Sequence, residues 1–492
     1  MIPVLLIVIP LVAGMAAFFM KNEKAVRAWA LFASIITLII SLLGLTILKE
    51  PHWLQHQSAW LSNLGSSFSV KLDGMGQILC LLTAISYPII LIATWNSSYK
   101  KANNFFALML LAQAGLMGVF VAMDALLFYF FWELALIPMY FLCSQWGGEK
   151  RVAVTFKFFI YTFTGSLLML IGILYLYTLT PTHSFDISAF YNLPISNHTQ
   201  DWVFWLMFIA FAIKMPIFPF HTWQPDTYEQ TNTATTMVLS GVMVKMGVLG
   251  IIRWLVPVLP AASYQWGDTV TTMAIIGMIY ASLIAIQQNN LKRLVAYSSI
   301  AHIGLMCAAI FAETKTGMQG VMIQMFNHGI NIIGLWIVVE LIERQFGTCK
   351  ISELGGVAQK APGMAMLFTI IVLANIALPL TNAFVGEFLM FTGIFTSSIT
   401  QFNIVFTALA GVSIILAVVY SLNMIRKVFY GNTNELTAGA RDIRLKGKFI
   451  LAIIVILIFV VGIYPQYMLN ISGETVDAIL KKADVTPFLI SK

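Results

Sequence analysis

Apolar runs long enough to cross a bilayer as helices recur along the whole chain, and they constrain its fold more than any other feature. A helix needs roughly 20 apolar residues to cross a hydrocarbon core of about 30 Å. Of the 492 residues, 59% are hydrophobic and only 10% are charged, whereas about 25% of the residues in a soluble domain are charged. Since a helix satisfies its own backbone hydrogen bonds inside lipid, the sequence predicts an all-α polytopic protein embedded in a lipid bilayer.

The predicted membrane spans number about fourteen and are separated by polar or Pro/Gly-containing breaks. Their approximate boundaries are 3–20, 28–48, 78–95, 105–123, 125–145, 155–179, 202–220, 235–256, 269–287, 298–312, 318–342, 364–398, 403–426 and 449–469. The twelfth run is longer than one crossing and is interrupted by LPLTNAF. The first run lacks a basic start and a clear cleavage site, so we expect a retained span and not a cleaved signal.

The basic residues predict the orientation in the membrane. An even number of spans places both termini on the same side. With the N-terminus outside, most of the 28 Lys and Arg residues fall in inward-facing loops. Because basic residues concentrate in cytoplasmic loops, we expect both termini on the outer side. The net charge of +7 is then explained by these loops, and nucleic-acid binding is not indicated.

Two predicted spans are broken in comparable ways. The seventh contains KMPIFPFH and the twelfth contains LPLTNAFVGEF, so each combines proline with an ionisable residue. Proline frees backbone carbonyls, which at membrane depth need protein or a wet cavity around them. Interrupted segments at matching places in two halves indicate an internal repeat, and an offset of five spans makes the repeats inverted. The predicted domains are three helices in 1–100, a five-helix repeat in 101–260, its inverted counterpart in 261–430, and a last helix with a tail in 431–492.

Four ionisable residues lie inside predicted spans: Glu133, Lys214, Lys245 and Glu387. A charge near the bilayer centre costs about 2.5–3.5 kcal/mol even on the lenient insertion scale, so these side chains must face protein, water or each other. One interpretation is a set of buried salt bridges that lock helices. The other is a proton relay, in which a glutamate close to Lys214 favours its protonated form. A relay accounts better for Lys245, which has no second acid nearby in sequence.

Histidines extend this series. His302 and His328 lie in the tenth and eleventh predicted spans, between Lys245 and Glu387 in sequence, and a histidine can accept and donate a proton near neutral pH. His221 ends the broken seventh span, and for it a relay role and a plain buried polar role stay equally open.

Cofactor-binding signals are missing from the sequence. The four cysteines, Cys80, Cys143, Cys307 and Cys349, are scattered without a C-x-x-C pair. Neither a Walker loop nor a strand-associated G-x-G-x-x-G is present, and no metal-ligand cluster is visible. We therefore expect no cofactor and no metal on this chain, and energy for proton movement from elsewhere.

The chain closely resembles the antiporter-like membrane subunits of respiratory complex I from about residue 70 to residue 430. Six segments carry the resemblance: FFWELALIPMYFL, AIKMPIFPFHTWQPD, LSGVMVKMGVLGIIRW, LKRLVAYSSIAHIG, MFNHGINIIGLW and FVGEFLMF. Glu387 favours the subunit M type, because subunit L and the multisubunit antiporters generally carry lysine there, and the chain lacks the long C-terminal extension of subunit L.

The resemblance implies a fold of fourteen helices in two inverted five-helix repeats and a role for each candidate residue. Glu133 and Lys214 would be the coupling pair, Lys245 the central relay, His302 and His328 connecting groups, and Glu387 the exit-side carrier. The host would be a translocating NADH:quinone oxidoreductase in a bacterial inner membrane. FMN, iron–sulfur clusters and quinone are expected in partner subunits, with L-type and N-type neighbours. A hydrogenase-type complex and a multisubunit cation/proton antiporter remain alternatives.

The sequence departs from the family pattern at two places. After the seventh span it reads QPDTYEQTNTATT, where the family usually has a leucine before Pro-Asp, a histidine near Tyr228 and a proline near Asn232. In the broken twelfth span, Leu380 stands where glycine is common. We expect these changes to affect the loop conformation and to leave the four buried charges untouched.

Overall fold

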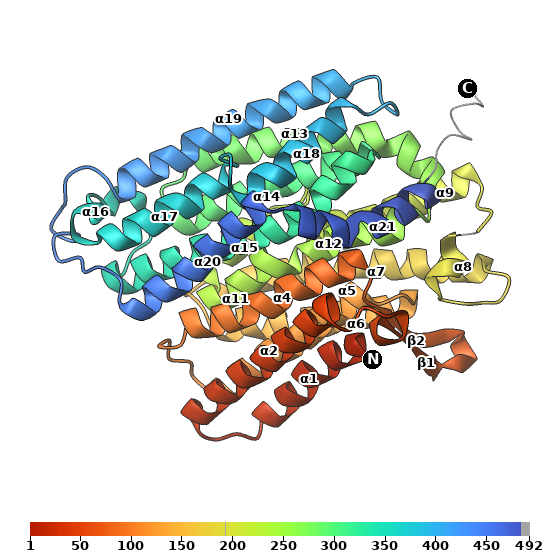
Figure 1. Ribbon diagram of the computed structural model, residues 1–492, viewed down its shortest axis with the longest axis horizontal. Helices are drawn as coiled ribbons and strands as arrows, with labels where there is room; N and C mark the ends of the chain where they lie inside the picture. The colour runs from red at the N-terminus through yellow and green to blue at the C-terminus, as the bar shows by residue number, and fades with distance from the viewer. Residues whose placement is uncertain (192, 484–492) are drawn as a thin grey trace.

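A computed structural model describes residues 1–191 and 193–483. Residues 484–492, part of the predicted outward tail, lie outside the described residues. The described chain is a bundle of long helices that run roughly side by side. The N-terminus and a small hairpin lie at one end of the bundle, and α16 lies at the other (Figure 1).

The first half of the bundle is built from helices that follow one another along the chain. They are α1 (Ile2–Ala17), α2 (Glu23–Thr46), α3 (Pro51–Leu54), α4 (Gly74–Ala93), α5 (Ala102–Val121), α6 (Ala125–Gln145), α7 (Arg151–Leu179), α8 (Ile187–Tyr191), α9 (Asn197–Lys214), α10 (Trp223–Gln230), α11 (Thr233–Val238) and α12 (Lys245–Gly250), with the π-helical turns η2 (Leu239–Met243) and η3 (Ile251–Leu255) on either side of α12.

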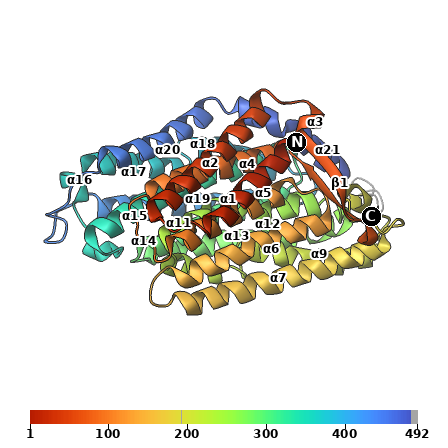
Figure 2. The same cartoon turned by 90° about the horizontal axis from the view of Figure 1, so that it is seen from below.

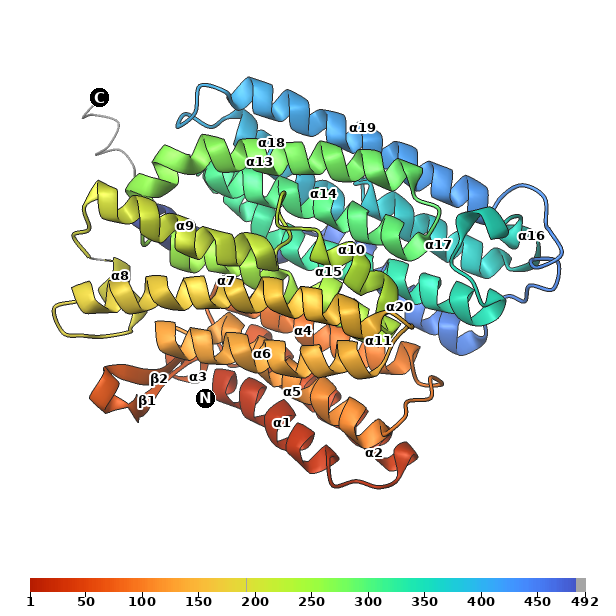
Figure 3. The ribbon, with the colours of Figure 1, turned by 180° about the vertical axis from the view of Figure 1, so that it is seen from behind.

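The second half continues in the same way. Its elements are α13 (Pro260–Gln287), α14 (Leu291–Phe311), α15 (Lys315–Phe346), the 3-10 turn η4 (Ile351–Glu353), α16 (Val357–Lys360), α17 (Pro362–Asn375), α18 (Asn382–Phe395), α19 (Asn403–Val428), α20 (Leu445–Ile463) and α21 (Gln466–Lys482). Seen from below, α7 lies along one edge of the bundle (Figure 2). Seen from behind, α19 lies along one edge and α1 at the opposite edge (Figure 3).

The predicted helical membrane bundle is confirmed. Among the described residues, 11 helical segments are long and apolar enough to cross a membrane, and α1, α17 and α18 are shorter apolar helices. The exact count of fourteen spans stays a prediction. The predicted last span, 449–469, crosses a helix break, because α20 ends at Ile463 and α21 begins after Pro465, whose missing N–H cannot continue a helix.

Burial identifies the helices at the centre of the bundle. In the most apolar stretch of each span, 100% of Thr233–Leu255, 94% of α14 and 89% of α15 are buried within the chain, against 33% for α19 and 28% for α20. Helices buried on all sides form a core, whereas helices with one apolar exposed side face lipid or a partner. The central helices are the ones that carry Lys245, His302 and His328.

Both predicted breaks occur where the sequence places them. The first separates α9 from α10, and there the Trp223 indole N–H donates to the Ile213 carbonyl at 3.0 Å. The second separates α17 from α18, and there the Asn327 amide of α15 donates to the Asn382 carbonyl at 2.7 Å. At the first break, the indole thus satisfies a carbonyl that the end of α9 releases, and at the second, the Asn327 amide holds α15 to the first turn of α18.

The departures noted in the sequence have local structural consequences. Leu380 adopts φ +74°, the left-handed region that glycine enters without a steric penalty, so a leucine here is strained. Asn232 stands where the family has proline, and its side chain caps α11 by accepting from the Thr235 N–H at 3.1 Å. Asparagine and proline both suit the start of a helix, so the α10–α11 turn forms with asparagine in place of proline.

A β-hairpin lies between the second and third predicted spans and is absent from the sequence-based prediction. Strands β1 (Gln55–Leu61) and β2 (Ser66–Lys71) pair antiparallel across the 3-10 turn η1 (Ser62–Leu64), with Gly65 at φ +73°. The alternation along these short strands is weak because β1 is exposed along nearly its whole length, and the hairpin therefore leaves little hydrophobic pattern in the sequence.

A buried ion pair joins the start of α4 to the π-helical turn η3. The Arg253 guanidinium donates to both carboxylate oxygens of Asp73, at 2.6 and 2.8 Å, and to the Phe120 carbonyl at 2.8 Å. The Arg253 side chain is only 2% exposed. Removing one partner of a buried pair leaves an uncompensated charge.

We predict that Asp73→Ala destabilises the chain by roughly 3–5 kcal/mol. The matched control is Asp477→Ala, because the Lys315–Asp477 pair is 55% exposed on both sides and such pairs contribute about 0–1 kcal/mol. Thermal unfolding of the detergent-solubilised full chain measures both. Equal unfolding midpoints for the two variants would contradict the assigned role of the Arg253 pair.

Candidate functional site

The buried lysine of α12 contacts a histidine of α15. Lys245 is 0% exposed, and its ammonium donates to the Ser240 carbonyl at 2.9 Å and lies 2.8 Å from His328 Nδ1. Lysine has only donors, so His328 Nδ1 is the acceptor. The other ring nitrogen of a neutral histidine then carries the hydrogen, and His328 Nε2 lies 3.1 Å from the Ser299 hydroxyl. The turns η2 and η3 on either side of α12 are π-helical, and π-helical turns are frequent at functional sites.

A second buried pair lies beside the first. His302 Nδ1 of α14 is 3.1 Å from Glu387 Oε1 of α18, and the Asn375 amide at the end of α17 lies 3.2 Å from His302 Nε2. The Asn375 amide can donate to Nε2, which leaves Nδ1–H to donate to the carboxylate. Gln324 of α15 contacts the same Glu387 oxygen at 3.5 Å.

The two pairs lie side by side and form one series of titratable groups. The rings of His302 and His328 have their centroids 5.9 Å apart. A cavity of about 20 Å³ adjoins His302 and Glu387 and is also lined by Ser413 and Ile376. A site needs roughly 10–15 Å³ and polar partners to hold a water, so this cavity can accept one. The structure thus brings together four predicted residues, Lys245, His328, His302 and Glu387.

Glu133 of α6 and Lys214 of α9 form a pair that is separate from the Lys245–Glu387 series. The Lys214 ammonium, at the last residue of α9, has no hydrogen-bond partner and lies 5.5 Å from the centroid of the Trp132 ring. Glu133 follows Trp132 on α6 and is an electrostatic neighbour of Lys214, but the two do not form a direct ion pair, and Glu133 Oε1 is also without a partner. A cation over an indole face gains a modest attraction, which partly replaces the missing carboxylate contact.

A close contact between α9 and α12 separates Lys214 from Lys245. Within the described residues, no hydrogen bond connects Lys214 to Lys245. Instead Gly247 of α12 packs against the end of α9, and a Cβ added there would lie 2.6 Å from the Phe211 carbonyl and 2.8 Å from the Met215 nitrogen. Gly247 therefore sets how closely the two lysine-bearing helices approach.

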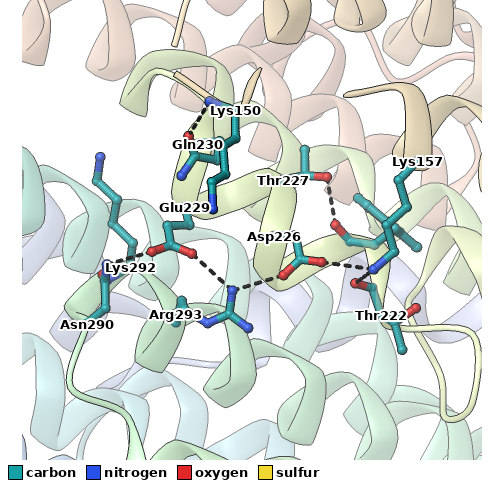
Figure 4. Close-up of polar contacts among 11 residues, drawn as sticks. Lys150, Lys157, Thr222, Asp226, Thr227, Glu229, Gln230, Asn290, Lys292 and Arg293 are labelled. Atoms are coloured by element: carbon teal, nitrogen blue, oxygen red, sulfur yellow. Dashed lines mark hydrogen bonds and ion pairs between the residues drawn. The ribbon is translucent and has the colours of Figure 1, made fainter. Parts of the chain in front are cut away.

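Helix α10, which follows the Lys214 break, carries a charged face (Figure 4). Asp226 accepts from Lys157 of α7 and from Arg293 of α14, both at 2.9 Å, and Arg293 also donates to Glu229 at 3.0 Å. Burial raises the pKa of Asp226, but the hydrogen bonds and charges of Lys157 and Arg293 outweigh burial and hold that pKa below its ordinary value. The network ties α10 to both halves of the bundle.

The opposite face of α10 carries buried polar groups that sequence reasoning missed. Gln224 and Tyr228 are 0% exposed and lie near each other, and Thr231 is 2% exposed and lies near the Cys143 thiol, but none of their side-chain amide and hydroxyl atoms makes a hydrogen bond of good geometry. An unsatisfied buried polar group costs roughly 1–3 kcal/mol, so such groups normally bind water or mark function. The sequence marked these positions only by their departure from the family pattern, because Gln224 replaces a leucine and Tyr228 stands near the usual place of a histidine.

Four further residues were missed for a different reason. They are polar residues in apolar helices, and only their contacts in space distinguish them. Those contacts are Ser299 with His328, Asn375 with His302, Gln324 with Glu387, and Asn327 with the start of α18.

His221 lies apart from the series of Lys245, His328, His302 and Glu387. It is 3% exposed and packs against the rings of Phe218 and Tyr280, with Nδ1 unpartnered.

Metal ligation has no support in the described ranges 1–191 and 193–483, where no cluster of His, Cys, Asp and Glu could hold an ion. The six predicted site residues are titratable side chains on six helices, α6, α9, α12, α14, α15 and α18. Such side chains can bind and release protons.

Comparison with known proteins is consistent with this geometry. The family model described as NADH:quinone oxidoreductase/Mrp antiporter, TM, matches residues 122–414. The chain belongs to this family. The matched range contains all six predicted site residues, from Glu133 to Glu387.

Relatives and solved structures of the NADH:quinone oxidoreductase/Mrp antiporter family match nearly the whole chain. The chain is 35% identical to the NADH-quinone oxidoreductase subunit M of Rickettsia bellii over 472 residues, which covers 94% of both chains. It is 32% identical to the subunit M of Pseudomonas aeruginosa over 501 residues, or 96% of both. A chain of respiratory complex I from Thermus thermophilus matches with TM-score 0.91 and 26% identity, covering 98% of this chain and 100% of that one.

A more distant likeness shows the fold alone. A chain of the Mrp complex from Dietzia sp. matches with TM-score 0.86 and 18% identity, over 99% of this chain and 98% of that one. The fold is therefore shared across the two branches that the family's description joins.

We predict that Gly247→Ala destabilises the chain by about 1–3 kcal/mol, because the added methyl overpacks the contact with α9. Gly411→Ala is the matched control, since a Cβ there meets nothing within 4 Å and alanine is favoured over glycine within a helix. Thermal unfolding in detergent distinguishes them. A Gly247→Ala midpoint at or above the control's would mean that the two helices do not depend on this contact.

Proposed function

We propose that this chain is a proton-translocating membrane subunit, of the subunit M type, of a bacterial NADH:quinone oxidoreductase. The observation that carries the proposal is the buried series from Lys245 through His328, Ser299 and His302 to Glu387. Two subunit M relatives cover 94% and 96% of the chain, and Glu387 matches the residue type of that subunit. A series of carriers inside the best-buried helices favours transport over a purely structural set of salt bridges.

In the proposed cycle, the second half of the chain conducts the proton. Lys245 releases a proton to His328 Nδ1, and His328 Nε2–H is passed by way of the Ser299 hydroxyl toward His302. His302 Nδ1–H then protonates the Glu387 carboxylate, which releases the proton to the outer side. The 5.9 Å between the two histidine ring centroids is spanned by the serine hydroxyl and a water, since a relay step needs heavy atoms within about 3.2 Å of each other or one water between them.

The first half of the chain controls delivery to Lys245. Glu133 and Lys214 are close enough to interact yet not in contact, so a small shift of either side chain changes how strongly the carboxylate favours the ammonium. Such a charge pair with two arrangements is a physical basis for coupling over distance. The buried polar face of α10, with Gln224, Tyr228 and Thr231, holds water that supplies Lys214 from the inner side.

The setting of the chain follows from the same proposal. The chain lies in a bacterial inner membrane with both termini outside, and it forms part of a membrane arm between L-type and N-type neighbours. FMN, iron–sulfur clusters and quinone belong to partner subunits, and their redox reaction drives the cycle. The four segments 1–100, 101–260, 261–430 and 431–492 are the proposed units, with the middle two as inverted repeats.

We predict that Lys214→Ala and Lys245→Ala, each in the assembled complex, slow proton transfer through this chain by about 10²-fold or more, the usual contribution of a positioned proton carrier. The measurement is the number of protons pumped per NADH oxidised in inside-out vesicles. Lys427→Ala, at an exposed position on α19, is the control.

The arginine variants separate a relay from a structural lock. Arg keeps the positive charge but cannot release its proton in a protein. Lys214→Arg and Lys245→Arg are therefore expected to assemble and to pump as poorly as the alanine variants. Normal pumping by the arginine variants would show that charge alone is needed and would exclude the relay.

A vesicle experiment with the isolated chain separates the proposed function from that of a free-standing antiporter. The purified chain, reconstituted without other subunits, is expected to give no proton flux in response to a sodium gradient. Sodium-dependent flux from the chain alone would assign it to the antiporter branch. Co-purification of NADH-oxidising subunits with the tagged chain distinguishes the proposed complex from a hydrogenase-type host.

A further inference from the structure

Four elements meet at the end of the bundle that bears most of the basic loops. The Arg27 guanidinium near the start of α2 donates to the Ser97 carbonyl at 2.8 Å, and Arg344 at the end of α15 donates to the Ser97 hydroxyl. Ser97 lies in the loop after α4. The same loop contains Trp95, whose ring centroid is 5.2 Å from the Lys446 ammonium at the start of α20. We call Arg27, Arg344 and Lys446 the basic seam.

The positive charge of the basic seam is not fully neutralised by the protein. Arg27 pairs with Glu23 at 2.6 Å and Arg344 pairs with Glu340 at 2.6 Å. Lys446 has no carboxylate partner among the described residues, and Arg27 and Arg344 repel it. Lys446 lies over the Trp95 ring, and the Arg27 guanidinium also lies over that ring, at 5.9 Å. Two cations sharing one indole leave a place where an anion is attracted.

An apolar groove begins at the same lysine. It has a volume of about 560 Å³ and is lined by Leu445, Lys446, Lys448, Phe449 and Ala452. Leu445 is 84% exposed and Phe449 is 62% exposed. Lys448 is held by Asp442 at 2.8 Å, so Lys446 is the groove cation without a carboxylate partner in the described part of the chain.

The groove continues into a long apolar exposed face. Further along α20, Ile456, Val460 and Ile463 are exposed by 59%, 56% and 65%. These positions lie on a helix of which only 28% is buried in its most apolar stretch. A cation at the membrane surface with a continuous apolar track running away from it matches the two ends of a phospholipid.

We propose that the basic seam and the α20 groove bind one anionic phospholipid of the inner-facing leaflet. Its phosphate lies between Lys446, Arg27 and Trp95, and one acyl chain follows Phe449 and Ile456 along α20. A tryptophan at the interface and basic side chains between helix ends on the cytoplasmic side are the features that recognise such lipids. A free anion would not use the apolar track, and a zwitterionic lipid carries an ammonium that the seam repels.

The test uses the full-length chain purified in detergent and native mass spectrometry with added phosphatidylglycerol or phosphatidylcholine of the same acyl chains. Phosphatidylglycerol is expected to bind saturably at one high-affinity site, and phosphatidylcholine to bind weakly without saturation. Lys446→Gln is expected to weaken phosphatidylglycerol binding about fivefold, which is the effect of removing one lysine near an anionic surface. Lys446→Arg should bind as the unmodified chain does.

The controls address folding, other lysines and the acyl chain. Lys427→Gln, an exposed lysine on the lipid-facing helix α19, is expected to leave binding unchanged. Phe449→Gln is expected to weaken phosphatidylglycerol binding with the basic seam intact. Each variant is also checked for an unfolding midpoint equal to that of the unmodified chain.

Three binding results and one crosslinking result would overturn the proposal. The first is equal binding of the two lipids. The second is phosphatidylglycerol binding that is indifferent to Lys446→Gln. The third is displacement of the lipid by glycerol phosphate at equal concentration, which would assign the seam to free anions. In the assembled complex, a crosslink from position 449 to another subunit in place of lipid would show that a protein occupies the groove.

Discussion

The contact between Lys245 and His328 is the interaction on which the rest of the structure depends. The fully buried Lys245 donates to the Ser240 carbonyl and to His328 Nδ1, and the histidine nitrogen is an acceptor that adds no second permanent charge. That acceptor lies on α15, so the helices that carry the lysine and the histidine must both be central. Their burial in turn requires the remaining helices to enclose them, which explains why α14 and α15 are nearly covered while α19 and α20 are not.

The broken helices follow from the same constraint. A charged or polar side chain at membrane depth is tolerated where the surrounding backbone can be satisfied locally. Lys214 stands at the end of α9 and Asn375 at the end of α17, so each break places a polar group of the proposed site at a helix terminus. The Trp223 indole satisfies the Ile213 carbonyl beside Lys214, and the Asn327 amide holds the start of α18 against α15.

Much of the fold could be predicted from the sequence because hydrophobic run length is a strong signal in lipid. The helical class and both breaks were expected and are present. The β1–β2 hairpin was not, since short exposed strands carry no clear alternation, and the bend at Pro465 was placed inside a single span. In the site, Lys245, His302, His328 and Glu387 were predicted correctly as buried groups because charged residues and histidines are conspicuous in apolar runs. Ser299, Asn375 and the inner face of α10 could not be found that way, since a serine or glutamine in a membrane helix gains meaning only from what lies across from it in space.

The ion-pair network around Asp226 has a consequence for how sequences of this kind can diverge. Asp226 serves two cations from different halves of the bundle, Lys157 and Arg293. Loss of Asp226 leaves Lys157 without its counterion, and loss of Lys157 or Arg293 leaves Asp226 with one cation in place of two. Selection would remove each of these single changes more readily than the loss of all three together. The three positions are thus expected to change together. Asp226 then shares one evolutionary history with a position more than sixty residues before it and another more than sixty residues after it.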